Sequence, residues 1–223
     1  MPPADRICKN LGRVPAPIGA ALRVLQFSIE GLSAAKRAVI SRIAQEHNVD
    51  VLCLQETPVL ATNNIAESYK TYGYDLIIAT PSVVFGRATY ERSDTADVFS
   101  ISSSDFSDAV QVGGFKIVNV YKLPSAHWNE SVLLIFSHPV MYVGDFNSHH
   151  TKWGYTEPDT DGEALYEWAT NNNLILTHDS KKRGTFYSSR WQREYSSLLD
   201  KFTYSSSPAS KSDSFARLST QPT

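Results

Sequence analysis

The segment Gly144–His150, with the sequence GDFNSHH, carries the most informative side chains of this chain. It follows the apolar run 139–143, which is typical of a buried strand that ends in a turn. Asp145 and Asn147 lie two positions apart, so on an extended strand end both point to the same side. A carboxylate and a carboxamide leaving a buried strand together need a polar partner: a phosphate, an attacking water or a metal shell. An ordinary corner held by Asx-type turn bonds explains these residues alone equally well.

A second acidic residue ends another apolar run. Residues 51–55, VLCLQ, are typical of a buried strand, and Glu56 follows them directly. Residues 22–27, LRVLQF, predict a strand upstream. Between the two, Ser33 is suited to cap a helix whose apolar residues recur near helical spacing from residue 34 onward. This strand–helix–strand order predicts a sheet covered on at least one face.

The remaining pattern predicts several hairpins and a second helix. Gly113 and Gly114 separate two apolar runs, which is a two-residue hairpin signal. A helix is expected to open at residues 161–163 and to stop near 171–173. Further strands are expected at 74–79, around 88–91, and at 98–102, 110–112, 115–121 and 174–177.

Length and charge limit the alternatives. A chain of 223 residues suits one sizeable α/β domain. Its net charge of −2 gives no general attraction to nucleic acid, so DNA affinity would have to come from a local basic cluster. A solvated loop is the alternative interpretation of that cluster, which consists of Lys181, Lys182, Arg183, Arg190 and Arg193, interleaved with Phe186, Tyr187 and Trp191.

The ends of the chain differ from its middle. Residues 1–20 are proline-rich without periodicity and predict a disordered leader, whereas the serine-rich residues 206–223 predict a disordered tail. A folded domain is expected over 21–205. No apolar run reaches membrane-spanning length, and the start lacks the apolar core of a signal peptide. We therefore expect an intracellular protein, nuclear or cytoplasmic, without membrane contact.

Four ordered motifs resemble the endonuclease/exonuclease/phosphatase superfamily, which includes apurinic endonucleases, pancreatic deoxyribonuclease and inositol-phosphate phosphatases. The chain is most similar to the endonuclease domains of non-LTR retrotransposons. The resemblance covers about residues 22–205. Its motifs are QFSIEGLSAAKRAVISRIAQEHNVDVLCLQET, VNVYKLPSAHW, GDFNSHHTKWG and DGEALYEWATNNNL. It implies an α/β (α+β) fold of four layers, in which two packed mixed β-sheets are flanked by helices.

The resemblance also implies metal-dependent nicking of DNA, with Mg²⁺ as cofactor and Mn²⁺ as a substitute. Glu56 matches the metal-binding glutamate of the family. Asp145 matches the aspartate that positions or deprotonates the attacking water, and Asn147 the amide that orients it. Tyr121 matches a tyrosine whose hydroxyl reaches a phosphate oxygen. DNA is the implied partner, with a reverse transcriptase domain once fused to the chain and no obligate protein partner.

Other positions depart from the family pattern or carry weaker expectations. Ser28 stands where the family has a metal-holding asparagine, and a hydroxyl is a weaker ligand. Asp200 is the candidate for a late catalytic aspartate, although its register is ambiguous. We expect His149, together with Arg190 and Trp191, to contact the substrate.

The end of the family pattern is missing. The terminal Ser-Asp-His motif corresponds only to Ser212-Asp213-Ser214, and no histidine follows His178. We therefore expect a C-terminally truncated domain that lacks its last strands. Three functions stay open: a DNA-nicking phosphodiesterase, a catalytically impaired relic of one, and a phosphatase on the same fold.

Overall fold

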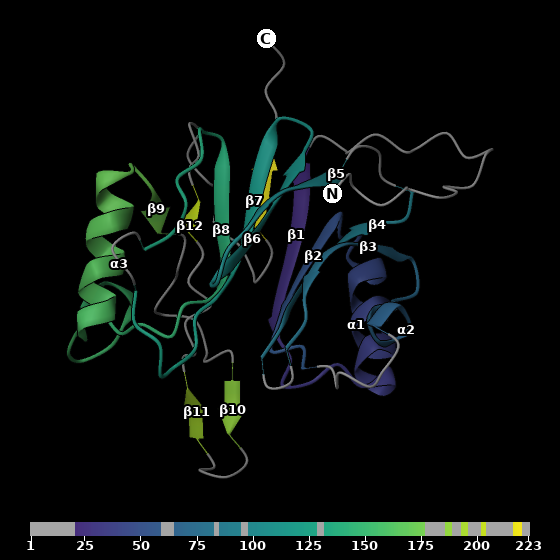
Figure 1. Ribbon diagram of the computed structural model, residues 1–223, viewed down its shortest axis with the longest axis horizontal. Helices are drawn as coiled ribbons and strands as arrows, with labels where there is room; N and C mark the ends of the chain where they lie inside the picture. Colours follow the sequence, from purple (N-terminus) through teal and green to yellow (C-terminus); the bar gives the residue numbers. More distant parts are fainter. Residues whose placement is uncertain are drawn as a thin grey trace.

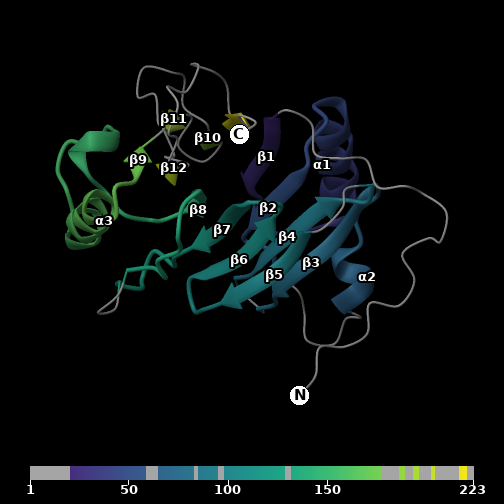
Figure 2. The same ribbon diagram turned by 90° about the horizontal axis from the view of Figure 1, so that it is seen from above.

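The computed structural model describes residues 21–58, 65–82, 85–94, 98–128 and 132–176, and the backbone of four short strands beyond them. Two β-sheets pack against each other at the centre, and helices lie on the outer side of each sheet (Figures 1 and 2). The helices are α1 (Ala34–Glu46), α2 (Ile65–Tyr69) and α3 (Thr160–Asn171), with a 3₁₀ turn, η1, at Thr151–Trp153. The expected four-layer fold is therefore confirmed.

The first sheet has the strand order β13-β1-β2-β4-β3. Its strands are β1 (Ala21–Ser28), β2 (Val51–Gln55), β3 (Tyr74–Thr80), β4 (Arg87–Arg92) and β13 (Ala216–Ser219). The second sheet has the order β5-β6-β7-β8-β12-β9. Its strands are β5 (Val98–Ser103), β6 (Ser107–Val112), β7 (Phe115–Tyr121), β8 (Val140–Asp145), β9 (Ile175–Leu176) and β12 (Phe202–Thr203). A separate pair is formed by β10 (Phe186–Ser188) and β11 (Arg193–Tyr195).

The alternation of side chains along each strand divides the core into layers. In β8, Met141 and Val143 belong to the cluster between the two sheets, whereas Val140 and Tyr142 belong to the cluster under α3. Strand β2 alternates in the same way between the inter-sheet cluster and the cluster under α1 and α2. Because successive side chains of a strand point to opposite faces, buried strands of this kind bind two apolar layers at once.

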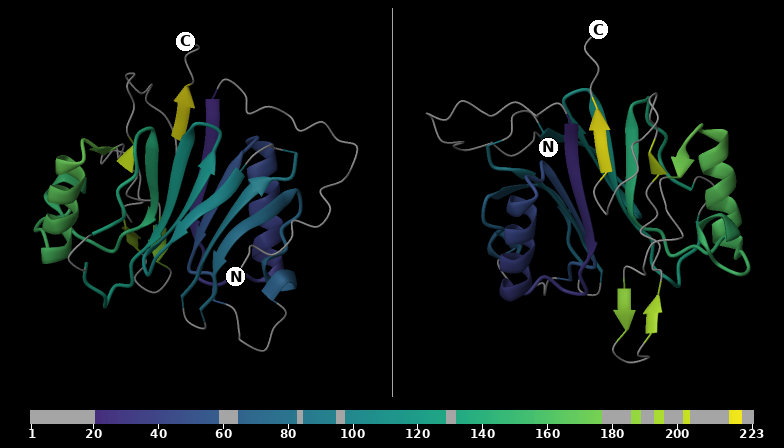
Figure 3. Two further views of the ribbon diagram at one scale, coloured as in Figure 1. Left: turned by 45° about the horizontal axis from the view of Figure 1, so that its top comes forward. Right: turned by 180° about the vertical axis from the view of Figure 1, so that it is seen from behind.

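Two parallel strand pairs end at the same edge of the molecule. Strand β1 runs parallel to β2, and Ser28 is the partner of Gln55 at their carboxyl ends. Strand β7 runs parallel to β8, and Tyr121 is the partner of Asp145 at theirs. The polar residues that end these four strands therefore gather at one rim of the sandwich. Figure 3 shows the two sheets from two further directions.

A line of buried amides crosses the interface between the sheets. The Gln55 side chain donates to Asn119 Oδ1 and accepts from Gln26, so the line links β1, β2 and β7. Asn119 Nδ2 in turn donates to Leu54 O at 3.3 Å and to Thr89 Oγ1 at 3.1 Å. Buried amides of this kind tolerate little displacement, because a shift of one sheet would leave them without partners.

An ion pair joins the same two sheets nearby. Arg87 Nε of β4 lies 3.1 Å from Asp108 Oδ2 of β6, and both side chains are almost fully buried. The carboxylate also accepts bonds from Thr80 and Ser103, and the guanidinium donates to the carbonyl oxygens of residues 104 and 105. Each charge is therefore well compensated inside the protein.

Most predicted elements are confirmed, and three expectations need correction. Strands β12 and β13 occupy sheet positions that we expected to be empty, and Ala216–Ser219 pairs with β1 although it lies in the predicted tail. Its backbone pairs with the outer edge of β1, whose N–H and C=O groups would otherwise lack partners. Helix α2 was not predicted, because five residues are too few for a periodic signal. Strand β9 covers only part of the expected 174–177.

No helix among the described residues is long and apolar enough to cross a membrane.

We expect Arg87→Met to lower the free energy of unfolding by about 3–5 kcal/mol, because it leaves the buried Asp108 carboxylate without its cation. Urea denaturation followed by circular dichroism measures the change. Adding Asp108→Asn to the same chain removes the unpaired charge and should recover part of the loss. If the double variant is no more stable than the single one, the unpaired charge is not the cause.

Candidate active site

Residues from both sheets meet at the rim. Tyr121 ends β7 and Asp145 ends β8 as partners, while Glu56 follows β2 in the opposite sheet. The Tyr121 hydroxyl donates to Glu56 Oε1 at 3.1 Å across the interface. Side chains that are 65 positions apart in the sequence are thus in direct contact. The structure therefore brings the phenol of Tyr121 into contact with the Glu56 carboxylate, beside the strand end that carries Asp145.

The backbone at the rim takes conformations that L-residues rarely adopt. Glu56 has φ +54° and Asn147 has φ +42°, both in the left-handed region. Gly144 has φ +147°, and a Cβ there would lie only 1.9 Å from Val120 O. Glycine is therefore required at position 144 for β8 to approach β7 this closely. Left-handed turns at Glu56 and Asn147 cost energy and are typical of functional sites.

Asn147 is held by two hydrogen bonds. Its backbone N–H donates to Asp145 Oδ1 at 3.3 Å, which is an Asx-type turn bond. Its side-chain Nδ2 donates to Lys122 O at 2.7 Å, at the start of the loop after β7. The turn interpretation and the catalytic interpretation of this motif are therefore compatible. The turn fixes the amide while Oδ1 of Asn147 remains an acceptor.

Burial sets the protonation of the rim. It raises the pKa of the Asp145 carboxyl to about 6. The hydrogen bond from Asn147 N–H and the positive charge of Lys122 lower this pKa, whereas the negative charge of Glu56 raises it. Burial also raises the pKa of the Tyr121 hydroxyl, and the charge of Glu56 and its hydrogen bond raise it further. Tyr121 is therefore a hydrogen-bond donor at neutral pH, and Asp145 exchanges its proton close to neutrality.

Ser28 lies beside the rim but is exposed. The turn that follows it is bound to the neighbouring strand, because Ile29 N donates to Gln55 O at 3.1 Å and Gly31 N to Glu56 O at 2.7 Å. Ser28 and Glu56 therefore end adjacent parallel strands on the same side. This placement is compatible with the expected shared ligand role, which stays a prediction.

The two neighbouring histidines have different surroundings. His150 is buried, caps η1 by accepting from Lys152 N at 3.0 Å, and stacks on Tyr166 at 4.5 Å between ring centroids. His149 has a side chain that is 52% exposed and stacks on Tyr155 at 4.1 Å. His150 is thus a packing residue. The His149 ring also has its Nδ1 3.5 Å from Asp159 Oδ2, and its expected substrate contact stays a prediction.

Several predicted site residues lie outside the described residues. These are Asp200, Arg190 and Trp191, together with the rest of the basic cluster at 181–183 and the motif at 212–214. Within the described ranges, no group of three or more His, Cys, Asp or Glu residues could hold a metal ion. The metal-binding role of Glu56 stays a prediction.

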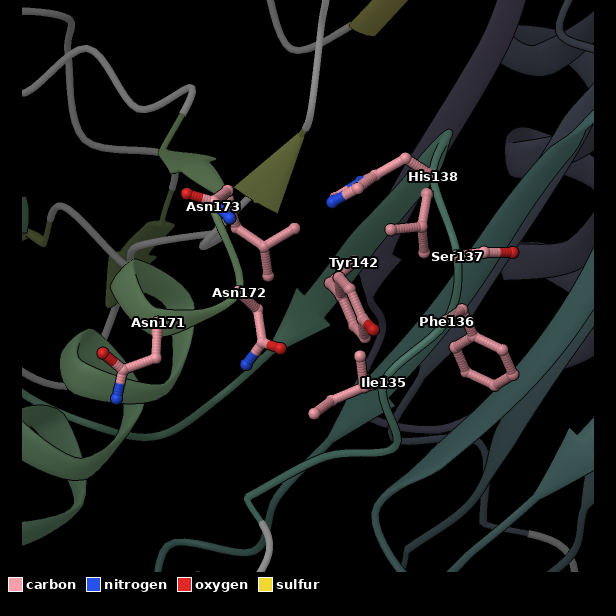
Figure 4. Close-up of a pocket in the computed structure, with 10 residues that line it drawn as sticks. Ile135, Phe136, Ser137, His138, Tyr142, Asn171, Asn172 and Asn173 are labelled. Atoms are coloured by element: carbon pink, nitrogen blue, oxygen red, sulfur yellow. The ribbon is translucent and has the colours of Figure 1, made fainter.

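A pocket elsewhere in the molecule is separate from the rim. It has a volume of about 290 Å³ and lies between the loop at 135–138 and the end of α3 at Asn171–Asn173 (Figure 4). Tyr142 lines it from the outer face of β8. Asp145 is three residues along the same strand and faces the other sheet. The pocket is thus on the opposite side of the second sheet from the candidate active site.

Sequence reasoning missed Lys122 at the edge of the site. Its side chain is completely buried, and its Nζ lies 3.0 Å from Asp161 Oδ2 of α3. The lysine directly follows Tyr121 and precedes a Leu-Pro pair. Nothing in that local pattern distinguishes it from a surface lysine after a strand, since its partner is 39 positions away.

The rim defines a class of protein: a two-sheet α/β sandwich with a phenol and carboxyl groups where the sheets meet. Comparisons place this class among known folds. Residues 115–220 match the family model described as endonuclease-reverse transcriptase. This range includes Tyr121, Asp145 and Asn147, and it extends past residue 205. No curated protein matches the chain in sequence.

Solved structures share the fold at low sequence identity. The endonuclease domain of TRAS1, a telomere-specific non-LTR retrotransposon, is 17% identical with a TM-score of 0.57, covering 82% of this chain and 84% of that one. An AP endonuclease from Archaeoglobus fulgidus is 14% identical with a TM-score of 0.56, covering 81% and 85%. The 3′ phosphatase NExo from Neisseria, bound to a product DNA hairpin, is 14% identical with a TM-score of 0.57, covering 82% and 86%.

The match over residues 115–220 and the shared fold make this chain similar to endonuclease/exonuclease/phosphatase proteins, whose α/β fold it has. Its relatives in fold include nucleases and a phosphatase.

We expect Asp145→Asn to stabilise the protein at pH 8 but not at pH 4. The raised pKa means that folding disfavours the ionised carboxylate, and this penalty builds up between about pH 4 and pH 6 and persists above it. The gain should be on the order of 1–3 kcal/mol. Thermal denaturation at both pH values measures it, with Asp105→Asn on the surface as control. Equal effects of Asp145→Asn at both pH values would contradict this explanation.

Proposed function

We propose that this chain hydrolyses phosphodiester bonds of DNA with a bound Mg²⁺ ion, as a nicking endonuclease of retrotransposon type. The proposal is carried by one observation, the contact of Tyr121 with Glu56 beside the buried carboxyl of Asp145. The family match to endonuclease-reverse transcriptases supports DNA as substrate and a reverse transcriptase as an associated domain.

In this proposal Glu56 and Ser28 would hold the magnesium ion. Mg²⁺ binds through one or two carboxylates, keeps several waters and takes substrate phosphate oxygens as further ligands. Glu56 supplies such a carboxylate at the end of a strand, and Ser28 ends the neighbouring strand on the same side. When bound, Mg²⁺ neutralises charge on the phosphate and on the leaving oxygen. Mn²⁺ suits the same oxygen ligands.

The protein's own side chains then have distinct roles. Asp145 in its ionised form accepts a proton from the attacking water, whose oxygen forms the new bond to phosphorus while the bond to the leaving sugar oxygen breaks. The Asn147 amide orients that water and contacts the phosphate. The Tyr121 hydroxyl, kept protonated by burial and by the nearby negative charge, donates to a phosphate oxygen.

Two alternatives follow from specific observations. In Ser212-Asp213-Ser214 a serine stands where the family motif Ser-Asp-His has its histidine, which favours an impaired relic. One relative in fold is a 3′ phosphatase, which favours a terminal phosphate as substrate. The experiment below separates these functions.

In the presence of Mg²⁺ we expect the chain to nick supercoiled plasmid, and chelation by EDTA to stop it. Glu56→Gln and Asp145→Asn should each slow nicking by about 10²–10⁴-fold, since one removes the metal carboxylate and the other the proton acceptor. Glu46→Gln, on the exposed side of α1, is the matched control and should leave the rate unchanged.

The other outcomes are equally informative. Unchanged nicking in both rim variants would show that the assigned site is wrong. A parent chain without nicking would support the relic. Release of phosphate from a 3′-phosphorylated oligonucleotide, without nicking, would support the phosphatase.

The nicking rate should fall as the pH drops below 6, by about tenfold for each pH unit, because only ionised Asp145 accepts the proton. The dependence of kcat/KM on pH between pH 5 and pH 8 measures this acid limb. A rate that stays constant down to pH 5 would remove Asp145 from the role of base.

A further inference from the structure

Lys122 is a buried lysine at the edge of the candidate site. Its side chain is 0% exposed, and Nζ donates to Ala126 O at 2.7 Å and to Asp161 Oδ2 at 3.0 Å. The ammonium also lies 5.6 Å from the centroid of the Trp128 ring. Removing two charges from water often cancels the attraction between them, so a buried pair is weak evidence for a role in stability. A different role has to be sought in what this pair holds.

The backbone of Lys122 binds both residues of the catalytic motif. Its N–H donates to Asp145 O at 3.0 Å, and its carbonyl oxygen accepts from Asn147 Nδ2 at 2.7 Å. One residue thus fixes the end of β8 and the direction of the Asn147 amide. Because Asn147 has φ +42°, its conformation needs such support from outside its own turn.

Asp161 ties this backbone to α3. Its Oδ2 accepts from Lys122, and its Oδ1 accepts from Trp128 N at 3.0 Å. Although burial opposes ionisation, the bonds from Trp128 and Lys122 lower the pKa of the Asp161 carboxyl. The N-cap of α3 also binds the segment 144–150, because Asp159 Oδ1 accepts from His149 N at 3.1 Å.

Helix α3 can approach the motif only because of a glycine. A Cβ at Gly162 would lie 1.7 Å from His149 O, so any larger residue would push the helix away. The helix start, the loop after β7 and the GDFN turn therefore form one tightly packed unit. Lys122 links the three: it lies on the loop after β7, its side chain pairs with Asp161 of α3, and its backbone binds the GDFN turn.

We infer that the buried Lys122–Asp161 pair is a positioning device for the reaction, which holds Asn147 and Asp145 in register with Tyr121. This inference rests on the proposed hydrolysis at the same rim. Lys122 is a positioning residue, since it reaches the site through its backbone and its charge rather than by touching substrate. The alternative is a pair that contributes only to folding.

The test replaces Lys122 by Met, which keeps the length and apolar volume of the side chain. We expect kcat for Mg²⁺-dependent nicking to fall about 10- to 100-fold with KM within about twofold, because the reacting groups are misplaced while DNA contacts persist. The acid limb of the pH profile should also move to higher pH, since the positive charge that favours ionised Asp145 is gone.

Arg92→Met is the matched control. Arg92 pairs with Asp50 at 3.3 Å, at the opposite end of β2 from Glu56, so its loss weakens the fold without reaching the rim. All rates are measured below the melting transition of each variant. If Lys122→Met does not fold, the double variant Lys122→Met, Asp161→Asn leaves no unpaired buried carboxylate at this pair and takes its place.

A second readout does not need catalysis. In the parent, NMR should show slow solvent exchange of the Asn147 side-chain amide and an Asp145 carboxyl that titrates near pH 6. Lys122→Met should speed that exchange and raise that midpoint, while Arg92→Met changes neither.

The outcomes separate this inference from the function on which it rests. Parent-like kcat, acid limb and amide exchange in Lys122→Met, with only a lower melting temperature, would overturn the positioning role. If the parent does not nick DNA, the proposed function fails, and the NMR measurements decide the positioning role alone. Unchanged exchange and titration would then overturn it, and the expected changes would support it.

Discussion

The buried hydrogen bond between the Gln55 and Asn119 side chains fixes how the two sheets are aligned along their strands, and the contacts at the rim depend on this alignment. Both side chains lie between the sheets with no exposed surface. One residue beyond Gln55 is Glu56, and the next inward-facing residue after Asn119 is Tyr121. The contact between Glu56 and Tyr121 is therefore the next contact between the sheets along these strands. Apolar packing alone would tolerate sliding of the sheets. A buried amide that loses its hydrogen-bond partner is strongly unfavourable, so this pair opposes sliding.

The rim differs from the interior in how its charges are compensated. Asp108, deep between the sheets, has a guanidinium and hydroxyl donors on its carboxylate. The side-chain carboxylate of Asp145 accepts, among the described residues, one bond, from Asn147 N, and has Glu56 as a negative neighbour. The first arrangement makes a buried charge tolerable, and the second leaves it poised between two protonation states. Together with left-handed backbone at Glu56 and Asn147, this is the pattern of a site shaped by chemistry at the expense of stability.

The sequence predicted the sheets and the rim because both follow from local patterns. Apolar runs and a hairpin signal identified the strands, and the acid at the end of 51–55 and the GDFN motif marked where they end. The burial of Lys122 was beyond reach, because it depends on Asp161, whose position relative to β7 is known only from the fold. Strand β13 was missed for a similar reason, since four residues of mixed polarity form a strand only because the edge of β1 offers partners. The roles of Asp200, Arg190 and Trp191 stay predictions.

Charge balance at the rim connects the proposed metal with the proposed substrate. Glu56 and Asp145 would repel a DNA phosphate, and the net charge of −2 offers no general attraction. The nearby cation Lys122 is fully buried, and its charge is matched by Asp161. A further positive charge would therefore help a phosphate to approach these carboxylates. A divalent cation held by Glu56, as proposed, would meet this need and would also attract the phosphate, so in the proposed reaction metal binding and DNA binding at the rim would support each other.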